Sequence, residues 1–105
     1  MNESNSFLDL NANTLESLSE LFTAIAAPTR LKILYLLIQR QSTVFQMAYY
    51  LQMTPSAISH QLRELRRWEL VSYFKRGKYH VYFCNSHNVE IILEKSIQLI
   101  KIKKH

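Results

Sequence analysis

The sequence predicts one mainly α-helical domain that carries a small β-hairpin. Over most of the chain, apolar residues recur three or four positions apart, which is the spacing of a helix face. Between Leu70 and Phe83 the period changes to two, and the only glycine of the chain, Gly77, lies inside this segment. Glycine supplies the positive φ that a tight hairpin turn requires. We therefore expect about five helices and one two-stranded hairpin.

Size and composition indicate a single folded unit. A chain of 105 residues with 48% hydrophobic residues is long enough for a modest core and too apolar for a disordered protein. We expect a flexible segment over residues 1–12 and a domain over residues 13–105. No apolar run approaches the ~20 residues of a membrane span, and the N-terminus does not resemble a signal peptide. These features predict a cytoplasmic protein.

Capping residues predict where the first two helices begin and end. Asn13 is suited to cap the first helix, with Glu16 as its capping-box partner, and the apolar spacing continues to about Ala26. Pro28 suits the first turn of a second helix, which ends near Arg40. The broad apolar face of this second helix predicts that it forms the centre of the core.

Two further helices follow with a short turn between them. Ser42 or Thr43 can cap a brief third helix, and a turn over residues 52–54 follows it. Thr54 caps the fourth helix and Pro55 occupies its first position. Two helices joined by so short a turn form a helix-turn-helix unit. Together with the hairpin, this unit predicts a winged helix-turn-helix domain.

The last helix, capped by Asn85 or Ser86, has a wider apolar band than a surface helix of a monomer needs. A second copy of the chain, or the first helix of that copy, is a natural cover for the excess. The sequence thus predicts a homodimer.

Charge is unevenly distributed along the chain, although the formal net charge is only +5. Residues 1–29 contain four carboxylates and no Lys or Arg, so all thirteen basic residues lie in 30–105, beside four glutamates. Six of the thirteen lie between residues 63 and 78. Such a concentration is typical of a surface that binds nucleic acid or another polyanion, although a solvated basic surface has the same composition.

The fourth helix carries polar side chains where a recognition helix meets base edges. Gln61 can hold adenine with two hydrogen bonds, and Arg63 can bind guanine or a phosphate. The candidate base-reading residues are Ser56, Ser59, His60, Gln61 and Arg63. The candidate phosphate-binding residues are Arg66 and Arg67 near the helix end, and Arg76 and Lys78 at the hairpin tip. These nine residues predict binding to double-stranded DNA, and the alternative is an ordinary amphipathic surface helix.

Three segments carry a family resemblance: LFTAIAAPTRLKILYLL, TPSAISHQLRELRRWELV and YFKRGKYHVYF. In their order they resemble the ArsR/SmtB family of bacterial repressors, over about residues 13–102, and the stretch SAISHQL is a rather specific motif. The resemblance implies a homodimer joined by its first and last helices, with two recognition helices in successive major grooves of a roughly palindromic operator. It also implies repression that an inducer, often a metal ion, relieves.

The chain departs from this family at the metal-binding positions. Metal-sensing relatives use thiolates at the start of the third helix, where this chain has Thr43, Val44 and Phe45. Others use carboxylate and histidine ligands on the last helix. At those positions this chain has Ser86, Asn88, Leu99 and Ile102. Aliphatic side chains do not bind cations, so we expect the usual metal site to be lost, with no cofactor and an unknown inducer.

Other interpretations remain. His87 and His105 leave open a remodelled metal site across the dimer, and a winged helix can also act as a protein-docking module. Cys84 is the only cysteine, and a small buried side chain is a simpler interpretation than a redox switch. An enzyme is not expected, because one glycine cannot make a glycine-rich phosphate loop, and arginines flank the candidate acid/base pair Glu64 and Glu69.

Overall fold

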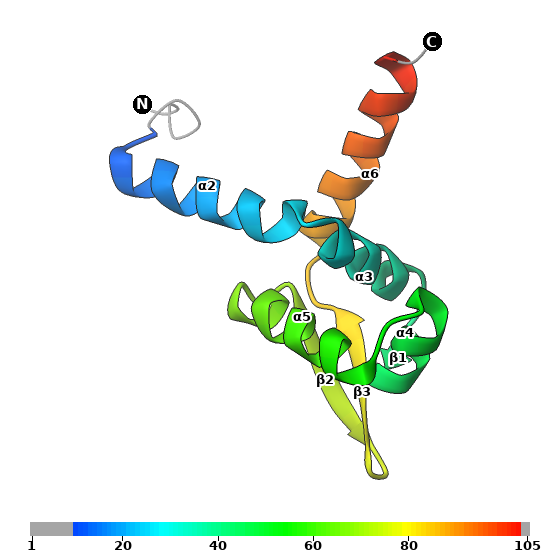
Figure 1. Cartoon of the computed structure of the whole chain (residues 1–105). Helices are drawn as coiled ribbons and strands as arrows, with labels where there is room; N and C mark the ends of the chain where they lie inside the picture. Colours follow the sequence, from blue (N-terminus) through cyan, green and yellow to red (C-terminus); the bar gives the residue numbers. More distant parts are fainter. Residues whose placement is uncertain (1–9, 104–105) are drawn as a thin grey trace.

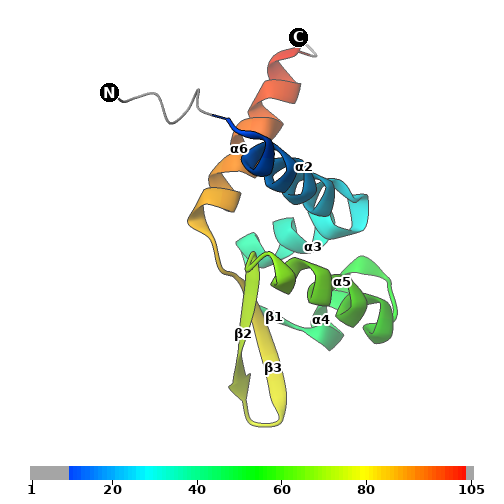
Figure 2. The same cartoon turned by 90° about the vertical axis from the view of Figure 1, so that its left-hand side faces the viewer.

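The computed structural model describes residues 10–103 as a bundle of helices with a projecting hairpin (Figures 1 and 2). The elements in chain order are α2 (Ala12–Ala26), α3 (Pro28–Gln39), β1 (Ser42–Thr43), α4 (Val44–Leu51), α5 (Pro55–Arg67), β2 (Val71–Arg76), β3 (Tyr79–Cys84) and α6 (His87–Lys103). The strands form one antiparallel sheet in the order β1-β3-β2. The winged helix-turn-helix arrangement predicted from the sequence is confirmed.

The N-terminal boundary of α2 differs from the prediction. Asn11, rather than Asn13, is the N-cap, and its Oδ1 accepts a hydrogen bond from the backbone N–H of Thr14 at 2.9 Å. Both asparagines are suitable caps, but starting the helix at Ala12 adds the residue with the best helix propensity. Most of the expected flexible segment, residues 1–9, lies outside the described residues.

The remaining helix starts agree with the sequence. Pro28 and Pro55 are the first residues of α3 and α5, where a missing N–H costs nothing. Thr43 caps α4 in a reciprocal capping box with Gln46, and Thr54 caps α5 by accepting from the N–H of Ala57. These caps fix where the two helices of the helix-turn-helix unit begin.

One strand was not expected from the sequence. Ser42 and Thr43 form β1 and pair with Tyr82 and Val81 of β3, so the sheet has three strands instead of the two expected. Two residues are too short to produce a period-two pattern, and Thr43 also serves as a helix cap. The strand ties the base of the hairpin to the start of α4, which restricts how far the hairpin can swing.

The core lies between α3, α4, α5 and the base of the hairpin. Ile33 and Leu34 of α3 are fully buried, as are Met47 of α4 and Ile58 and Leu65 of α5. Burial of each such side chain contributes about 1.5–3 kcal/mol. Because α5 packs with its apolar stripe inward, its polar stripe must face solvent.

Helices α2 and α6 extend outward from this core (Figure 1). Within residues 10–103 no single helix has the length and apolar composition for a membrane span. Helices α2 and α3 would pass that test only as a pair, and they meet at an 80° bend.

Glu69 adopts a left-handed backbone at the end of α5. Its φ is +57°, and the N–H of Leu70 donates to the carbonyl of Leu65 at 3.1 Å, as in a glycine-type helix end. A side chain with a Cβ is strained in this region, whereas glycine is not. Gly77 at the hairpin tip has a similar φ of +61°, and there the sequence supplies the glycine.

Replacing Glu69 by glycine is expected to stabilise the fold by about 1 kcal/mol, because it removes the strain of the left-handed backbone. The midpoint and slope of urea unfolding measure the change. Glu69→Ala removes the same carboxylate and keeps the strain, so it should give no such gain. Equal stability of the glycine and alanine variants would contradict the prediction.

Candidate nucleic-acid interface

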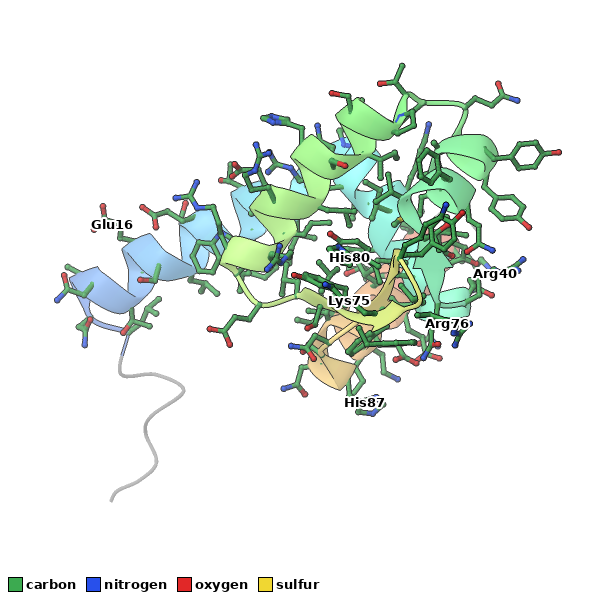
Figure 3. The ribbon with its side chains drawn as sticks, turned by 90° about the horizontal axis from the view of Figure 1, so that it is seen from below. Glu16, Arg40, Lys75, Arg76, His80 and His87 are labelled. Carbon is green, nitrogen blue, oxygen red and sulfur yellow. The ribbon has the colours of Figure 1, made fainter. Side chains whose placement is uncertain are left out.

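Helix α5 presents its polar stripe on the side of the molecule from which the hairpin projects. Figure 3, seen from below, shows α5 and the hairpin on the same face, with Lys75 and Arg76 labelled on the hairpin. Four of the sequence-predicted base readers have exposed side chains: Ser56, Ser59, His60 and Arg63. Their spacing of three, one and three residues keeps them on one side of the helix, opposite Ile58, Leu62 and Leu65.

Gln61 differs from the other four candidates because it is half-buried and tied to another helix. Its Oε1 accepts a hydrogen bond from Nε of Arg30 at 2.9 Å, and Nη1 of Arg30 also donates to the carbonyl of Ala24 at 3.1 Å. Because arginine only donates, the amide oxygen must face Arg30 and the amide N–H₂ faces away. In this orientation Gln61 points its amide N–H₂ away from Arg30, and Oε1 has one further lone pair besides the one that accepts from Arg30. The two-bond contact to adenine expected from the sequence needs that lone pair to face the base together with the N–H₂.

Arg66 and Arg67 have different surroundings, although they are neighbours in sequence. Arg67 lies 3.2 Å from Oε1 of Glu64, in an exposed i,i+3 pair. Such a pair is weak, so Arg67 can exchange partners at little cost. Arg66 lies over the ring of Tyr73, 4.8 Å from its centroid, and thus bridges the end of α5 to the hairpin.

Tyr82, which lies beside Arg66, has a pKa above its ordinary value. Burial raises the pKa of Tyr82, and the positive charge of Arg66 opposes that rise. Tyr73 and Tyr82 pair across β2 and β3, with ring centroids 5.2 Å apart. Arg66 therefore contacts the base of the hairpin and is also part of the exposed face of α5.

The hairpin tip carries the remaining predicted cations. Arg76 and Lys78 are exposed, one on each side of Gly77. The guanidinium of Arg76 lies 5.4 Å from the ring centroid of Phe74, and the ammonium of Lys78 lies 5.5 Å from that of Tyr79. The aromatic rings hold both cations at the tip without neutralising them.

Among the described residues, no three His, Cys, Asp or Glu side chains come together as a possible metal site. His87 lies 3.9 Å from Oε2 of Glu90 at the start of α6, and His105 lies outside the described residues. Ser86, one of the family's ligand positions, instead caps α6 by accepting from the N–H of Val89 at 3.3 Å. Cys84 is half-buried, and its Sγ donates to the carbonyl of Ser86.

Sequence reasoning missed two residues that shape this surface. Arg30 lies 31 positions before Gln61 and looked like an ordinary helix cation, and Tyr73 looked like an ordinary strand residue. No local pattern in the sequence links either residue to its partner. Only the packing of α5 against α3 and the hairpin brings these pairs together.

The chain is similar in sequence to bacterial transcription regulators. Residues 27–73 match the model of the bacterial regulatory protein, arsR family. The chain is 33% identical over 79 residues to the transcriptional repressor SmtB homolog of Synechocystis, a match of 75% of this chain and 59% of that protein. It is also 33% identical over 69 residues to the transcriptional repressor SdpR of Bacillus subtilis, a match of 66% of this chain and 77% of that protein.

A solved structure has the same fold. The homodimeric winged helix-turn-helix DNA-binding domain of a possible ArsR-family regulator from Mycobacterium bovis superimposes with a TM-score of 0.77. That alignment has 24% identity and covers 100% of this chain and 96% of the other. The family model, the two repressors and the shared fold agree with the resemblance seen in the sequence. The chain belongs to the arsR family of bacterial regulatory proteins.

Proposed function

We propose that the protein is a homodimeric transcriptional repressor that binds a specific site in double-stranded DNA. The observation that carries this proposal is the placement of α5 and the hairpin tip on one face, with exposed polar side chains on the first and exposed cations on the second (Figure 3). A major groove admits a helix, and the adjacent minor groove or its phosphates suit a basic hairpin tip.

The contacts divide into two kinds. Ser56, Ser59, His60 and Arg63 are proposed to read base edges, and Gln61 contributes amide donors in the orientation that Arg30 imposes. The phosphate contacts are assigned to Arg66, Arg67, Arg76 and Lys78. Phosphate contacts supply affinity for any duplex, whereas base contacts supply the choice of sequence.

The exposed apolar surface of the two outer helices supports the proposed dimer. Leu99 and Ile102 near the end of α6 are 67% and 72% exposed, and on α2 Leu15 and Phe22 are 52% and 49% exposed. Contiguous apolar surface of this kind on both outer helices is typical of a subunit interface. The relative from Mycobacterium bovis is described as homodimeric, which agrees with this assignment.

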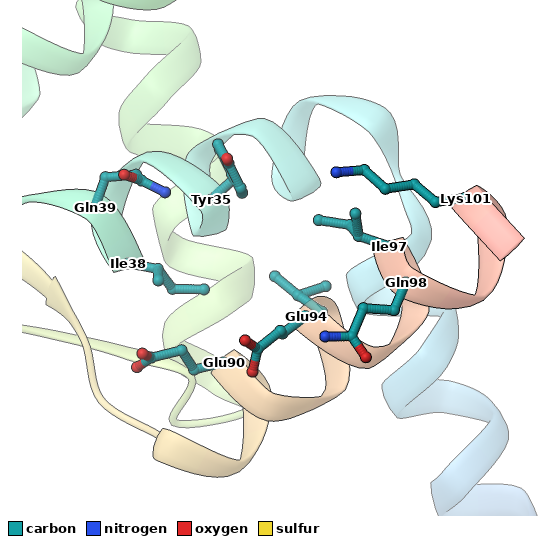
Figure 4. A pocket seen from close by; sticks show the side chains of 9 residues that line it. Tyr35, Ile38, Gln39, Glu90, Glu94, Ile97, Gln98 and Lys101 are labelled. Carbon is teal, nitrogen blue, oxygen red and sulfur yellow. The ribbon is translucent and has the colours of Figure 1, made fainter.

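A groove between α3 and α6 belongs to the same region. It has a volume of about 360 Å³, and Tyr35 and Ile38 of α3 face Ile97 of α6 across it (Figure 4). Leu93 of α6 also lines it. Tyr35 and Ile97, on its two walls, are 52% and 38% exposed, so a second copy can cover apolar surface here. We therefore assign the groove to the proposed dimer contact and not to a separate ligand.

Two alternative functions predict different experimental results. A metal-responsive repressor would use His87, with His105 of the second copy, in place of the lost ligands. A protein-docking module would use the same exposed faces without DNA. Steep weakening of binding between low and moderate salt is expected for DNA and not for docking.

Arg76→Ala is expected to weaken binding to a selected operator duplex and to a random duplex alike, since it removes a phosphate contact. Gln61→Ala is expected to cost about 1–3 kcal/mol on the selected duplex only, because it removes a base contact. Anisotropy titrations of both labelled duplexes at several salt concentrations measure the two effects.

The matched control for this pair is Lys32→Gln, which removes one exposed charge of α3 outside the proposed interface. It should leave the ratio of selected to random affinity unchanged. If Arg76→Ala and Gln61→Ala both retain wild-type affinity and selectivity, the assignment of this face to DNA is wrong.

Leu99→Asp is expected to weaken the dimer at least tenfold, because it places a carboxylate in an apolar interface. Sedimentation equilibrium over a range of concentrations measures the dimerisation constant. Tyr49→Asp is the control, since Tyr49 of α4 is 79% exposed and lies outside the proposed interface. Equal dimerisation of wild type and Leu99→Asp would exclude α6 from the interface.

Zinc is expected to bind weakly or not at all and to leave operator affinity unchanged, because the family's ligand positions hold Ser86, Asn88, Leu99 and Ile102. Calorimetric titration of zinc chloride into the metal-free protein tests this directly. Stoichiometric binding that His87→Ala abolishes would instead favour the metal-responsive alternative.

A further inference from the structure

An open cavity of about 270 Å³ lies beside the hairpin. Arg40 at the end of α3 lines one side, and Arg76 and Tyr79 of the hairpin line the other. Thr43 and Gln46, the cap and the third residue of α4, also line it, together with Gln41 and Val81. The cavity thus joins three separate parts of the chain.

Strand register places this cavity on the hairpin face that points away from α5. Arg76 pairs with Tyr79 and Phe74 pairs with Val81, so these side chains share one face of the hairpin. Tyr73 belongs to the opposite face, where Arg66 of α5 covers its ring. A ligand in the cavity would therefore lie on the outer side of the hairpin, away from the recognition helix.

The charged side chains of the cavity are all positive. Its lining includes the two arginines and no Asp or Glu. The N-terminus of α4 adds the partial positive charge of a helix start. These features together favour an anion, and a phosphate matches the donor geometry of two guanidinium groups.

Both arginines are held in place by neutral aromatic side chains. Nη1 of Arg40 donates to the hydroxyl of Tyr50 at 3.0 Å, and its guanidinium lies 5.2 Å from the centroid of that ring. Arg76 lies over Phe74 on the hairpin face that the cavity adjoins. These contacts restrict both side chains while their charges remain available for a ligand.

We propose that this cavity binds a backbone phosphate of the operator duplex, outside the base pairs that α5 reads. This inference rests on the proposed function. Arg76 belongs both to the hairpin tip assigned to DNA and to the cavity wall, so the two surfaces are continuous. A duplex that holds α5 on one side of the hairpin also passes its outer side, and its phosphates meet the cavity there.

The test uses the wild-type dimer and two duplexes that share one operator sequence recovered by selection from a random pool. The short duplex ends at the base pairs beneath the hairpin tips, and the long duplex adds about half a helical turn (about 5 base pairs) at each end. Wild type is expected to bind the long duplex about tenfold more tightly. Arg40→Gln is expected to lose this gain and to bind the short duplex as wild type does.

Salt dependence gives a second readout. Removing one phosphate contact from each of two subunits should reduce the slope of log K against log salt by about 2, on the long duplex only. Tyr50→Phe removes the hydrogen bond to Arg40 and keeps the charge, so it should retain most of the gain. Lys32→Gln removes one exposed charge of α3 outside the proposed interface and should retain all of it.

Three outcomes would overturn the inference while leaving the proposed function intact. The first is equal binding of both duplexes by wild type. The second is an equal loss for Lys32→Gln and Arg40→Gln, which would show an effect of net charge alone. The third is saturable binding of inorganic phosphate that Arg40→Gln abolishes, without any advantage of the long duplex. Failure of wild type to prefer the selected duplex over a random one would instead refute the proposed function.

Discussion

The packing of α5 against α3 and the hairpin is the constraint on which the rest of the surface depends. Ile58, Leu62 and Leu65 are buried on one side of α5, so the polar residues on the opposite side of the helix face solvent. The contribution of each buried side chain, about 1.5–3 kcal/mol, exceeds that of a solvent-exposed polar contact on the opposite face. The face proposed to bind DNA is thus oriented by the apolar side chains beneath it.

Electrostatics refines this orientation at two points. Arg30 fixes the amide of Gln61, and Arg66 bridges the end of α5 to Tyr73 on the hairpin. Arg30 is half-buried and uses its charge inside the protein, whereas Arg63, Arg66 and Arg76 are exposed. Net charge alone does not distinguish the two kinds of arginine. The roles proposed for individual cations follow from their neighbours.

The strained backbone at Glu69 shows how the fold and the surface are connected. The left-handed turn there brings the chain directly from α5 into β2, with Asn85 donating to the carbonyl of Glu69 at 3.4 Å. A longer connection would relieve the strain and loosen the hairpin relative to the helix. The strained turn therefore keeps the two proposed DNA-binding elements, α5 and the hairpin, close together.

The sequence by itself determined the order of helices, the starts of α3 and α5, and the hairpin, because these depend on residues a few positions apart. Pro28, Thr54, Pro55 and Gly77 stand where local backbone chemistry requires them. Only the tertiary structure decided that Asn11 caps α2, that β1 joins the sheet, and which partners Gln61 and Arg66 have. It also brought Arg40 and Arg76 to one cavity. Arg30 and Gln61, like Arg40 and Arg76, are more than 30 positions apart, and contacts at such separations leave no periodic pattern in a single chain, so packing alone specifies these pairs.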